Sequence, residues 1–373
     1  MKKIHYPNLN FLRFLAATLV VAHHIEQIKN ILGSKNYWNL KSVQLIGKLG
    51  VDLFFVLSGF LITSLLIEEK KQYIKVDIKK FLLRRVFRIW PLYFIVFILG
   101  FFLVPNIAFI NFGMSDTFIS PYDNITMNII LFVIFLPHIQ TFLIGPILIC
   151  AQTWSIGIEE NFYLVWPFIV NRWNKKAIIK GNLIFIGCNI FIILFFKFLS
   201  ERVSPNNILF WKIHDLFYYG LKFDCLLIGT LFALYYDFKK GKSSFLTKKP
   251  FQIFIYTLEI LLTISGSNFY GLFWEIHAIL YGIIIYNVIQ PKTSVVNMEF
   301  KIFDFLGKIS YGLYMYHFLI AVIVIKVCLR YDLLFLVYPT TYLLVIIIAS
   351  LSYYTIERYF LQKKTFYSKM ITG

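Results

Sequence analysis

Long apolar runs separated by short polar segments make up most of the chain. A membrane span needs about 20 mostly apolar residues, and ten segments approach that length. With no internal repeat and no long soluble loop, we predict an all-α polytopic membrane helix bundle that forms a single domain over residues 1–373. The predicted spans are residues 10–30, 47–67, 85–104, 153–170, 182–199, 214–236, 251–268, 271–289, 305–329 and 336–359.

One further apolar stretch, residues 127–150, differs from these ten because it contains Pro137, Gly145 and Pro146. Proline and glycine interrupt helices, and broken backbone at membrane depth is tolerated where protein surrounds it. We predict that this stretch is a re-entrant or interfacial segment. The alternative is a full span, which would reverse the orientation of every later segment and require another element to restore it.

Composition and charge support a membrane protein with both termini in the cytoplasm. Hydrophobic residues make up 59% of the chain and charged residues only 15%, while 37 Lys and Arg stand against 19 Asp and Glu, a net charge of +18. If the N-terminus is inside and residues 127–150 do not cross, most basic residues fall in inner loops, as the positive-inside rule requires. The basic excess therefore needs no nucleic-acid partner. The apolar start could also be a cleavable signal, but its pattern continues to Ile31, which favours a first membrane helix.

Two ionisable residues of the first predicted span are candidates for chemistry, because such residues are costly to insert. Arg13 and His24 are 11 residues apart, about three helical turns, so they share one face roughly 16 Å apart along the axis. A coenzyme A thioester is similarly arranged, with phosphates at one end and the reactive carbonyl at the other. His24 is a candidate general base, since imidazole titrates near neutral pH. The alternative remains that Arg13 reaches the headgroups and His24 bonds a neighbouring helix.

The most basic stretch of the chain ends in a second candidate pair. Arg85 and Arg88 lie one helical turn apart just before Pro91, and two adjacent guanidinium groups suit a phosphate or pyrophosphate. The lysines between residues 70 and 80 are better explained by orientation and by attraction to anionic lipid. A phosphorylated donor that enters from the cytoplasm would therefore meet these two arginines first.

Carboxylates in two further spans are candidate catalytic groups. A helix is predicted to begin near residue 153 with Thr153 or Ser155 as its cap, and Glu159 shares a face with Ser155. The Glu159 carboxylate is a candidate to orient the imidazole or to bind an acceptor hydroxyl. Acidic residues near a helix start also simply favour the helix dipole. Asp52, near the outer end of the second span, has the same two interpretations.

Several classes of site are not expected from the sequence. Its four cysteines stand singly in apolar runs without a C-x-x-C pair, so we predict no thiolate metal site. The sequence also lacks the P-loop, zinc-protease, nucleophile-elbow and dinucleotide-binding motifs. Any chemistry must then come from residues held in or at the bilayer.

Six motifs, in order on the ten predicted spans, resemble the acyltransferase family 3 of bacterial membrane O-acyltransferases. The resemblance covers nearly the whole chain, and the order of the motifs makes it specific. The motifs are Arg13-x10-His24, the segment 50–62 (GVDLFFVLSGFLI), Arg85-x-x-Arg88-Ile89-x-Pro91, Thr153-Trp154-Ser155-x-x-x-Glu159-Glu160-x-Phe162-Tyr163, Ser310-Tyr311-Gly312-Leu313-Tyr314-x-Tyr316-His317 and Ile356-Glu357-Arg358.

The resemblance implies an enzyme of the bacterial cytoplasmic (inner) membrane that moves an acetyl or other short acyl group. The donor would be acetyl-CoA or a related acyl-CoA, no metal would be needed, and the acceptor would be a hydroxyl of an envelope glycan or lipid-linked sugar. By the same match, His24 takes the place of the catalytic histidine and Arg13 that of its paired cation. Arg85 and Arg88 match the donor-binding arginines, and Glu159 falls on the Trp-Ser…Glu motif.

Departures from the family pattern leave some roles open. Lys222 stands where an arginine often precedes Asp224, and Tyr359 where a proline commonly follows Glu357-Arg358. No hydrolase-like domain follows the last span, so a stand-alone enzyme is expected. Our hypothesis is direct acyl transfer, and a covalent acyl-imidazole at His24 is the mechanistic alternative, which the sequence does not separate from it. The competing function is a transporter or flippase for a lipid-linked sugar, which would use the same buried charges to line a path.

Overall fold

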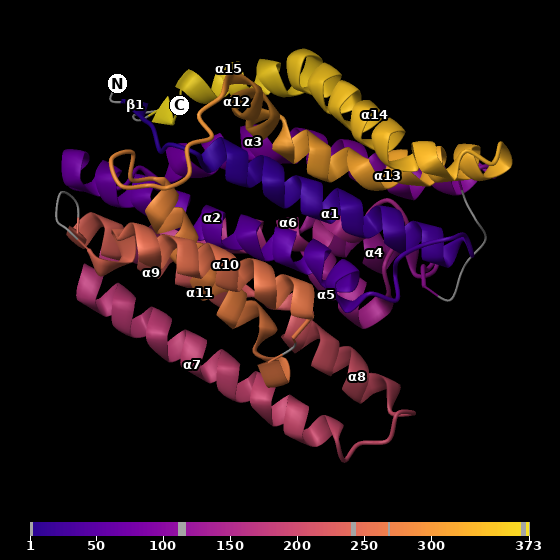
Figure 1. The fold of residues 1–373 in the computed structure, drawn as a ribbon, viewed down its shortest axis with the longest axis horizontal. Coiled ribbons are helices and arrows are strands. Elements are labelled where there is room, and N and C mark those ends of the chain that lie inside the picture. Colours follow the sequence, from indigo (N-terminus) through magenta and orange to yellow (C-terminus); the bar gives the residue numbers. More distant parts are fainter. Residues whose placement is uncertain (1–2, 111–116, 240–243, 268, 367–370, 373) are drawn as a thin grey trace.

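The fold is a bundle of long helices, as the apolar pattern predicts. The computed structural model describes residues 3–110, 117–239, 244–267, 269–366 and 371–372. Within these ranges the all-α prediction is confirmed, apart from two strands of two residues each (Figure 1). The elements are β1 (Lys3–Ile4), α1 (Leu9–Ile31), α2 (Lys41–Tyr73), α3 (Ile78–Ile98), α4 (Ile125–Val133), α5 (Pro137–Ile139), α6 (Trp154–Arg172), α7 (Lys175–Ser200), α8 (Ile208–Asp215), α9 (Phe223–Lys239), α10 (Lys249–Ser265), α11 (Phe273–Val288), α12 (Lys301–Lys308), α13 (Ser310–Arg330), α14 (Val337–Ser352), α15 (Arg358–Phe366) and β2 (Ile371–Thr372).

Each of the ten predicted spans overlaps a helix, but two of them are interrupted, 214–236 at residues 221–222 before α9 and 305–329 at residue 309 between α12 and α13. Four of these helices are not long apolar spans: α1 and α6 carry several ionisable residues, and α10 and α11 are only 17 and 16 residues long. The other six helical segments are long and apolar enough to cross a membrane. They are Lys41–Tyr73, Ile78–Asn106, Lys175–Ser200, Ile208–Lys239, Ser310–Arg330 and Leu334–Lys363.

The apolar stretch 127–150 is broken, as its prolines and glycine predict. Its residues are all described, and they form α4, α5 and a π-helical turn over Gln140–Ile144 instead of one continuous helix. Two backbone positions mark the breaks, because Phe135 and Gly145 have φ angles of 59° and 148°. The segment therefore contributes short, bent pieces that pack beside α6.

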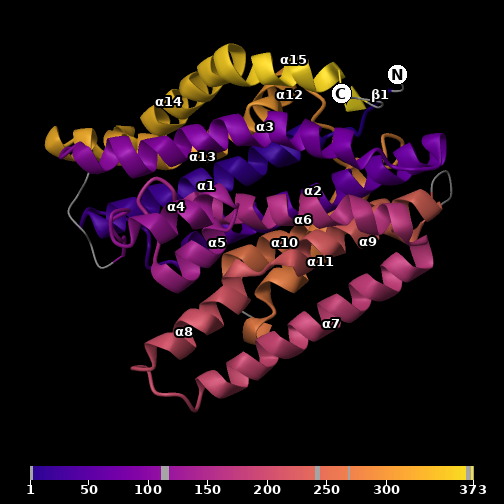
Figure 2. The ribbon, with the colours of Figure 1, turned by 180° about the vertical axis from the view of Figure 1, so that it is seen from behind.

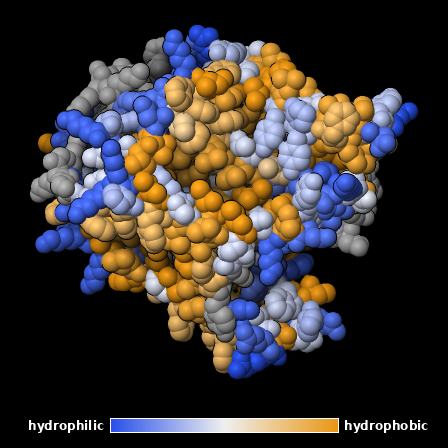
Figure 3. Space-filling view, viewed as in Figure 1, coloured by the Kyte–Doolittle hydropathy of each residue, from blue (hydrophilic) through white to orange (hydrophobic). Residues whose placement is uncertain are grey.

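Helix α2 lies at the centre of the bundle. It packs against α1, α9 and α11 and also contacts α6 and α10. Helices α13 and α14 cover α1 on one side, while α7 lies at the opposite edge (Figures 1 and 2). Apolar side chains cover the middle of the molecule and hydrophilic ones gather towards the ends of the helices (Figure 3). This distribution is that of a multi-pass membrane protein.

The two ends of the chain meet at one end of the bundle. Strands β1 and β2 form a parallel pair in which Lys3 is opposite Ile371 (Figure 1). An even number of crossings returns a chain to the side on which it started. The ten helices predicted as spans satisfy that parity.

Two glycines set the distance between α2 and α9. A Cβ atom on Gly59 would lie 1.9 Å from the carbonyl oxygen of Leu226, and one on Gly229 would lie 2.3 Å from that of Val56. The backbones are therefore in direct contact, the close packing that small residues allow between membrane helices.

We expect Gly59→Val to separate α2 from α9, since the new side chain has no room against the Leu226 backbone. Overpacking of this kind costs about 1–3 kcal/mol, which should lower the apparent Tm of the purified protein in detergent. Gly187→Ala is the matched control, because a Cβ atom there meets no described atom within 4 Å. Equal Tm values for the two variants would contradict this account of the α2–α9 contact.

Candidate active site

Arginines from two helices meet in one cavity of about 90 Å³. Arg13 enters from α1, and Arg85 and Arg88 from α3, so the predicted shared face of the latter pair is confirmed by their common cavity. Glu159 lies on the wall that α6 contributes. We call this cavity the arginine chamber.

The three arginines of this chamber differ from Arg84 and Lys222, which have carboxylate partners. Arg84, next to Arg85 in sequence, points elsewhere and pairs with Glu69 at 3.2 Å. Lys222 pairs with Glu275 at 2.7 Å in the same manner. Among the described residues, Arg13, Arg85 and Arg88 have no carboxylate oxygen within 4.0 Å. Because an unmatched charge away from bulk water is costly, this group of cations is suited to an anionic ligand.

Glu159 is held by two hydroxyl groups inside the arginine chamber. Ser58 donates to Oε1 at 2.7 Å, and Tyr163 donates to Oε2 at 3.0 Å. The guanidinium of Arg85 lies 5.6 Å from the centre of the Tyr163 ring, a cation–π contact. Glu159 is thus associated with the arginines, and His24 lines a different cavity. The geometry does not bring this carboxylate to the imidazole.

His24 lines a second and larger cavity of about 300 Å³, which we call the histidine chamber. His23 and Lys48 also line it, as do the aromatic side chains of Trp154 and Tyr219. Its volume is enough for a small organic group, since cavities of about 150 Å³ already hold benzene. Arg13 and His24 therefore both face cavities inside the bundle, and neither points to lipid.

A chain of hydrogen bonds assigns the proton on His24. The Nδ1 of His317 lies 2.6 Å from the backbone oxygen of Tyr314, so it carries a hydrogen, and its Nε2 is left as an acceptor. That Nε2 lies 2.9 Å from Nδ1 of His24, which is also 3.0 Å from the Val20 oxygen. Both partners are acceptors, so the hydrogen of neutral His24 is on Nδ1. The Nε2 of His24 then has the lone pair that a general base needs.

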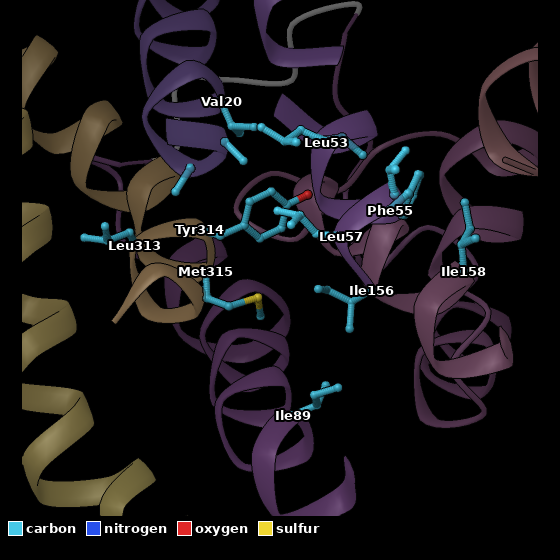
Figure 4. Packing of buried hydrophobic residues seen from close by; sticks show 14 of the residues in the cluster. Val20, Leu53, Phe55, Leu57, Ile89, Ile156, Ile158, Leu313, Tyr314 and Met315 are labelled. Carbon is cyan, nitrogen blue, oxygen red and sulfur yellow. The ribbon is translucent and has the colours of Figure 1, made fainter. Parts of the chain in front are cut away.

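Tyr314 separates the two chambers. Its side chain and that of Val51 line both cavities. The Tyr314 hydroxyl donates to the Gln152 carbonyl at 2.8 Å and accepts from Ser155 at 2.6 Å. Figure 4 shows the ring between α1, α2 and α13, close to Leu57. The two chambers are therefore neighbours divided by one tethered aromatic ring.

The start of α6 corrects a prediction about helix caps. The helix begins at Trp154, and neither Thr153 nor Ser155 accepts a hydrogen bond as its N-cap. The Thr153 hydroxyl donates instead to the Cys150 carbonyl at 2.7 Å, and that of Ser155 holds Tyr314. The capping prediction was wrong because these hydroxyls have tertiary and local partners that the sequence does not reveal.

Asp52 lies apart from both chambers. It is fully buried, lines neither cavity, and faces Cys225 and a group of acidic residues that includes Asp224 and Glu275. Val51, its neighbour on α2, lines both chambers, and one helical residue is a rotation of about 100°. Among the described residues, no group of three or more His, Cys, Asp and Glu side chains is arranged to hold a metal ion.

His317 is the last residue of the fifth sequence motif, but the sequence does not pair it with His24. The two residues are 293 positions apart, so no local spacing connects them. Two signals in the sequence point to this residue. His317 is an ionisable side chain inside a predicted span, and it belongs to the pattern Tyr314-x-Tyr316-His317.

Comparison with known proteins agrees with this arrangement. The profile of acyltransferase family 3, described as an acyltransferase domain, matches residues 6–355. The O-acetyltransferase OatA of Staphylococcus aureus is 29% identical over 329 residues, covering 83% of this chain and 52% of the relative. The peptidoglycan O-acetyltransferase OatA of Listeria monocytogenes is 28% identical over 348 residues, covering 84% and 49%.

The chain spans about half the length of these curated relatives. No solved structure matches it. The family profile extends over nearly the whole chain, from before α1 to the end of α14 and the turn that follows. The protein is therefore a member of acyltransferase family 3.

Proposed function

We propose that the protein is an integral-membrane O-acyltransferase that moves an acetyl or other short acyl group from acyl-CoA to a hydroxyl of an envelope glycan. One observation carries the proposal. A cavity with three unpaired guanidinium groups adjoins a second cavity in which His24 presents an unprotonated Nε2. The first suits the anionic end of a donor, and the second suits removal of a proton from a hydroxyl. The names of the relatives, O-acetyltransferases, agree with this chemistry.

The donor enters the arginine chamber with its phosphates against Arg13, Arg85 and Arg88. Each guanidinium offers paired N–H groups that match phosphate oxygens. Along α1, 11 residues separate Arg13 from His24, a rise of roughly 16 Å. The flexible pantetheine arm covers this distance, which carries the thioester past Tyr314 to the histidine chamber.

His24 then acts as the general base. Its Nε2 takes the proton of the acceptor hydroxyl while the hydroxyl oxygen attacks the thioester carbonyl carbon and forms a C–O bond. The C–S bond of the thioester then breaks. The same proton passes to the leaving thiolate, so free coenzyme A and the ester are the products. An acyl-imidazole formed on Nε2 would use the same nitrogen, so this tautomer serves either route.

His317 positions His24 and stabilises it when it carries the extra proton. A neutral acceptor opposite Nδ1 keeps the ring in one orientation and pairs with the N–H of the imidazolium. Glu159 acts in the arginine chamber, where it accepts hydrogen bonds from Ser58 and Tyr163 and so holds them beside Arg85. Asp52 has no comparable contact with either chamber, so we assign it no direct part in the transfer.

We place the enzyme in the bacterial cytoplasmic membrane with both termini in the cytoplasm, as one acyltransferase domain over residues 1–373. The basic residues of the predicted inner loops support this orientation. The pairing of β1 with β2 supports a common side for both ends. The arginine chamber then opens towards the cytoplasmic acyl-CoA, and the histidine chamber towards the acceptor.

His24→Ala should reduce acyl transfer by purified protein about 10²–10⁴-fold, the usual contribution of a general base. The measurement is release of coenzyme A from acetyl-CoA together with ester formation on a glycan acceptor. His5→Gln is the control, because His5 lines neither chamber and the amide keeps a donor for the Glu299 carboxylate that His5 contacts. If folded His24→Ala protein retains full activity, or if native protein moves a lipid-linked sugar without acylating it, the proposed function is wrong.

Arg85→Gln and Arg88→Gln should each raise the KM for acyl-CoA about 10- to 100-fold with a smaller change in kcat. Each substitution removes charge-assisted hydrogen bonds to phosphate, worth about 1.5–3 kcal/mol. Lys80→Gln is the matched control, since Lys80 is close to Asp77 outside the chamber. An unchanged KM for both arginine variants would remove the donor assignment.

His317→Ala should lower kcat about tenfold or more and leave the KM for acyl-CoA unchanged, because the residue contacts His24 and lies outside the arginine chamber. His317→Gln should recover part of the loss, since an amide oxygen can accept from Nδ1 of His24. A merely structural role predicts no such recovery and a general loss of folded protein instead.

A further inference from the structure

Lys48 is an unpaired cation inside the histidine chamber. It lies on α2, is half-buried, and lines the same cavity as His24. Its Nζ is 4.5 Å from the centre of the Tyr219 ring and 3.4 Å from the Tyr219 hydroxyl. Among the described residues it has no carboxylate oxygen within 4.0 Å. In this respect Lys48 resembles the three arginines of the arginine chamber.

Two other buried lysines of the bundle are paired with carboxylates. Lys29, also on the outer half of the α1–α2 pair, bonds Glu26 at 2.8 Å, and Lys222 bonds Glu275. Lysine side chains near helix ends often extend along the helix until the ammonium group reaches water. The ammonium group of Lys48 instead lies over the Tyr219 ring of the chamber wall. A half-buried ammonium group in this position is only partly compensated by the ring.

The wall beside Lys48 is continuous and aromatic. Phe142 stacks on Tyr219 with ring centres 6.1 Å apart, and Trp154 contacts both Phe142 and Trp274 edge to face. The indole nitrogen of Trp274 is buried and has no acceptor among the described residues. Flat aromatic surfaces suit the C–H faces of a sugar ring, and the few polar groups among them fix its orientation.

We propose that Lys48 binds an oxyanion of the acceptor, so that the acceptor is an acidic saccharide whose charged group is a carboxylate or a phosphate. This inference rests on the proposed acyl transfer and names its acceptor class. The sugar ring lies against the aromatic wall, the oxyanion pairs with the Lys48 ammonium, and a hydroxyl faces Nε2 of His24. The two chambers then both select anions, the donor through guanidinium groups and the acceptor through one ammonium group.

Three probes with the same ring test the proposal on the full-length protein in detergent. N-acetylglucosamine is neutral, N-acetylmuramic acid adds a carboxylate, and N-acetylglucosamine 1-phosphate adds a phosphate. Their binding is measured directly by calorimetry and, separately, by competition with acyl transfer. We expect one or both acidic probes to bind at least about tenfold more tightly than the neutral one, the usual effect of a charge-assisted hydrogen bond.

The variants separate charge recognition from folding. Lys48→Met should abolish the preference for the acidic probes, Lys48→Arg should keep it, and Lys41→Met at the exposed start of α2 should leave it unchanged. The two acidic probes distinguish a carboxylate from a phosphate acceptor. Equal binding of all three probes to native protein, or an equal loss for all three in Lys48→Met, would overturn the proposal.

Failure of the proposed function gives a different result. In that case native protein releases no coenzyme A from acetyl-CoA, whatever the probes do. If coenzyme A release is normal in native protein and in Lys48→Met, but the neutral probe binds as well as the acidic ones, only the acceptor assignment is lost.

Discussion

The arrangement of this protein depends on the cost of leaving a charge unmatched inside a membrane bundle. Most of its internal cations satisfy that constraint locally, as Arg84 does with Glu69 and Lys222 with Glu275. Arg13, Arg85 and Arg88 do not, and all three converge on one cavity. An anionic ligand in that cavity, as in the proposed function, would match their charges. The distribution of partners among the cations therefore distinguishes structural charges from those available for binding.

Helical periodicity was sufficient to predict the parts of the site that lie on one helix. Arg13 and His24 both face the interior because 11 residues complete about three turns, and Arg85 and Arg88 share a cavity because they are one turn apart. The ten apolar segments likewise became ten helices, since hydrophobic length is a local property. These features needed no knowledge of how the helices pack.

Features that depend on packing could not be predicted. The partner of His24 is His317, on a helix far along the chain, and the partners of Glu159 are hydroxyls on α2 and on its own helix. Asp52 is in the same motif as Ser58, yet only Ser58 reaches the arginine chamber, because the motif does not state which face meets α6. Spacing along the sequence predicts the direction in which a side chain points from its own helix. The residues that it contacts are known only from the packing of the helices.

Tyr314 closes the junction between the chambers through its bonds to Gln152 and Ser155. Two water-accessible cavities that joined end to end would form a conduit for ions across the bilayer. The tethered phenol ring at their meeting point would keep such a conduit closed. In the proposed function, such a seal would let the enzyme take its two substrates from opposite sides of the membrane without dissipating a proton gradient.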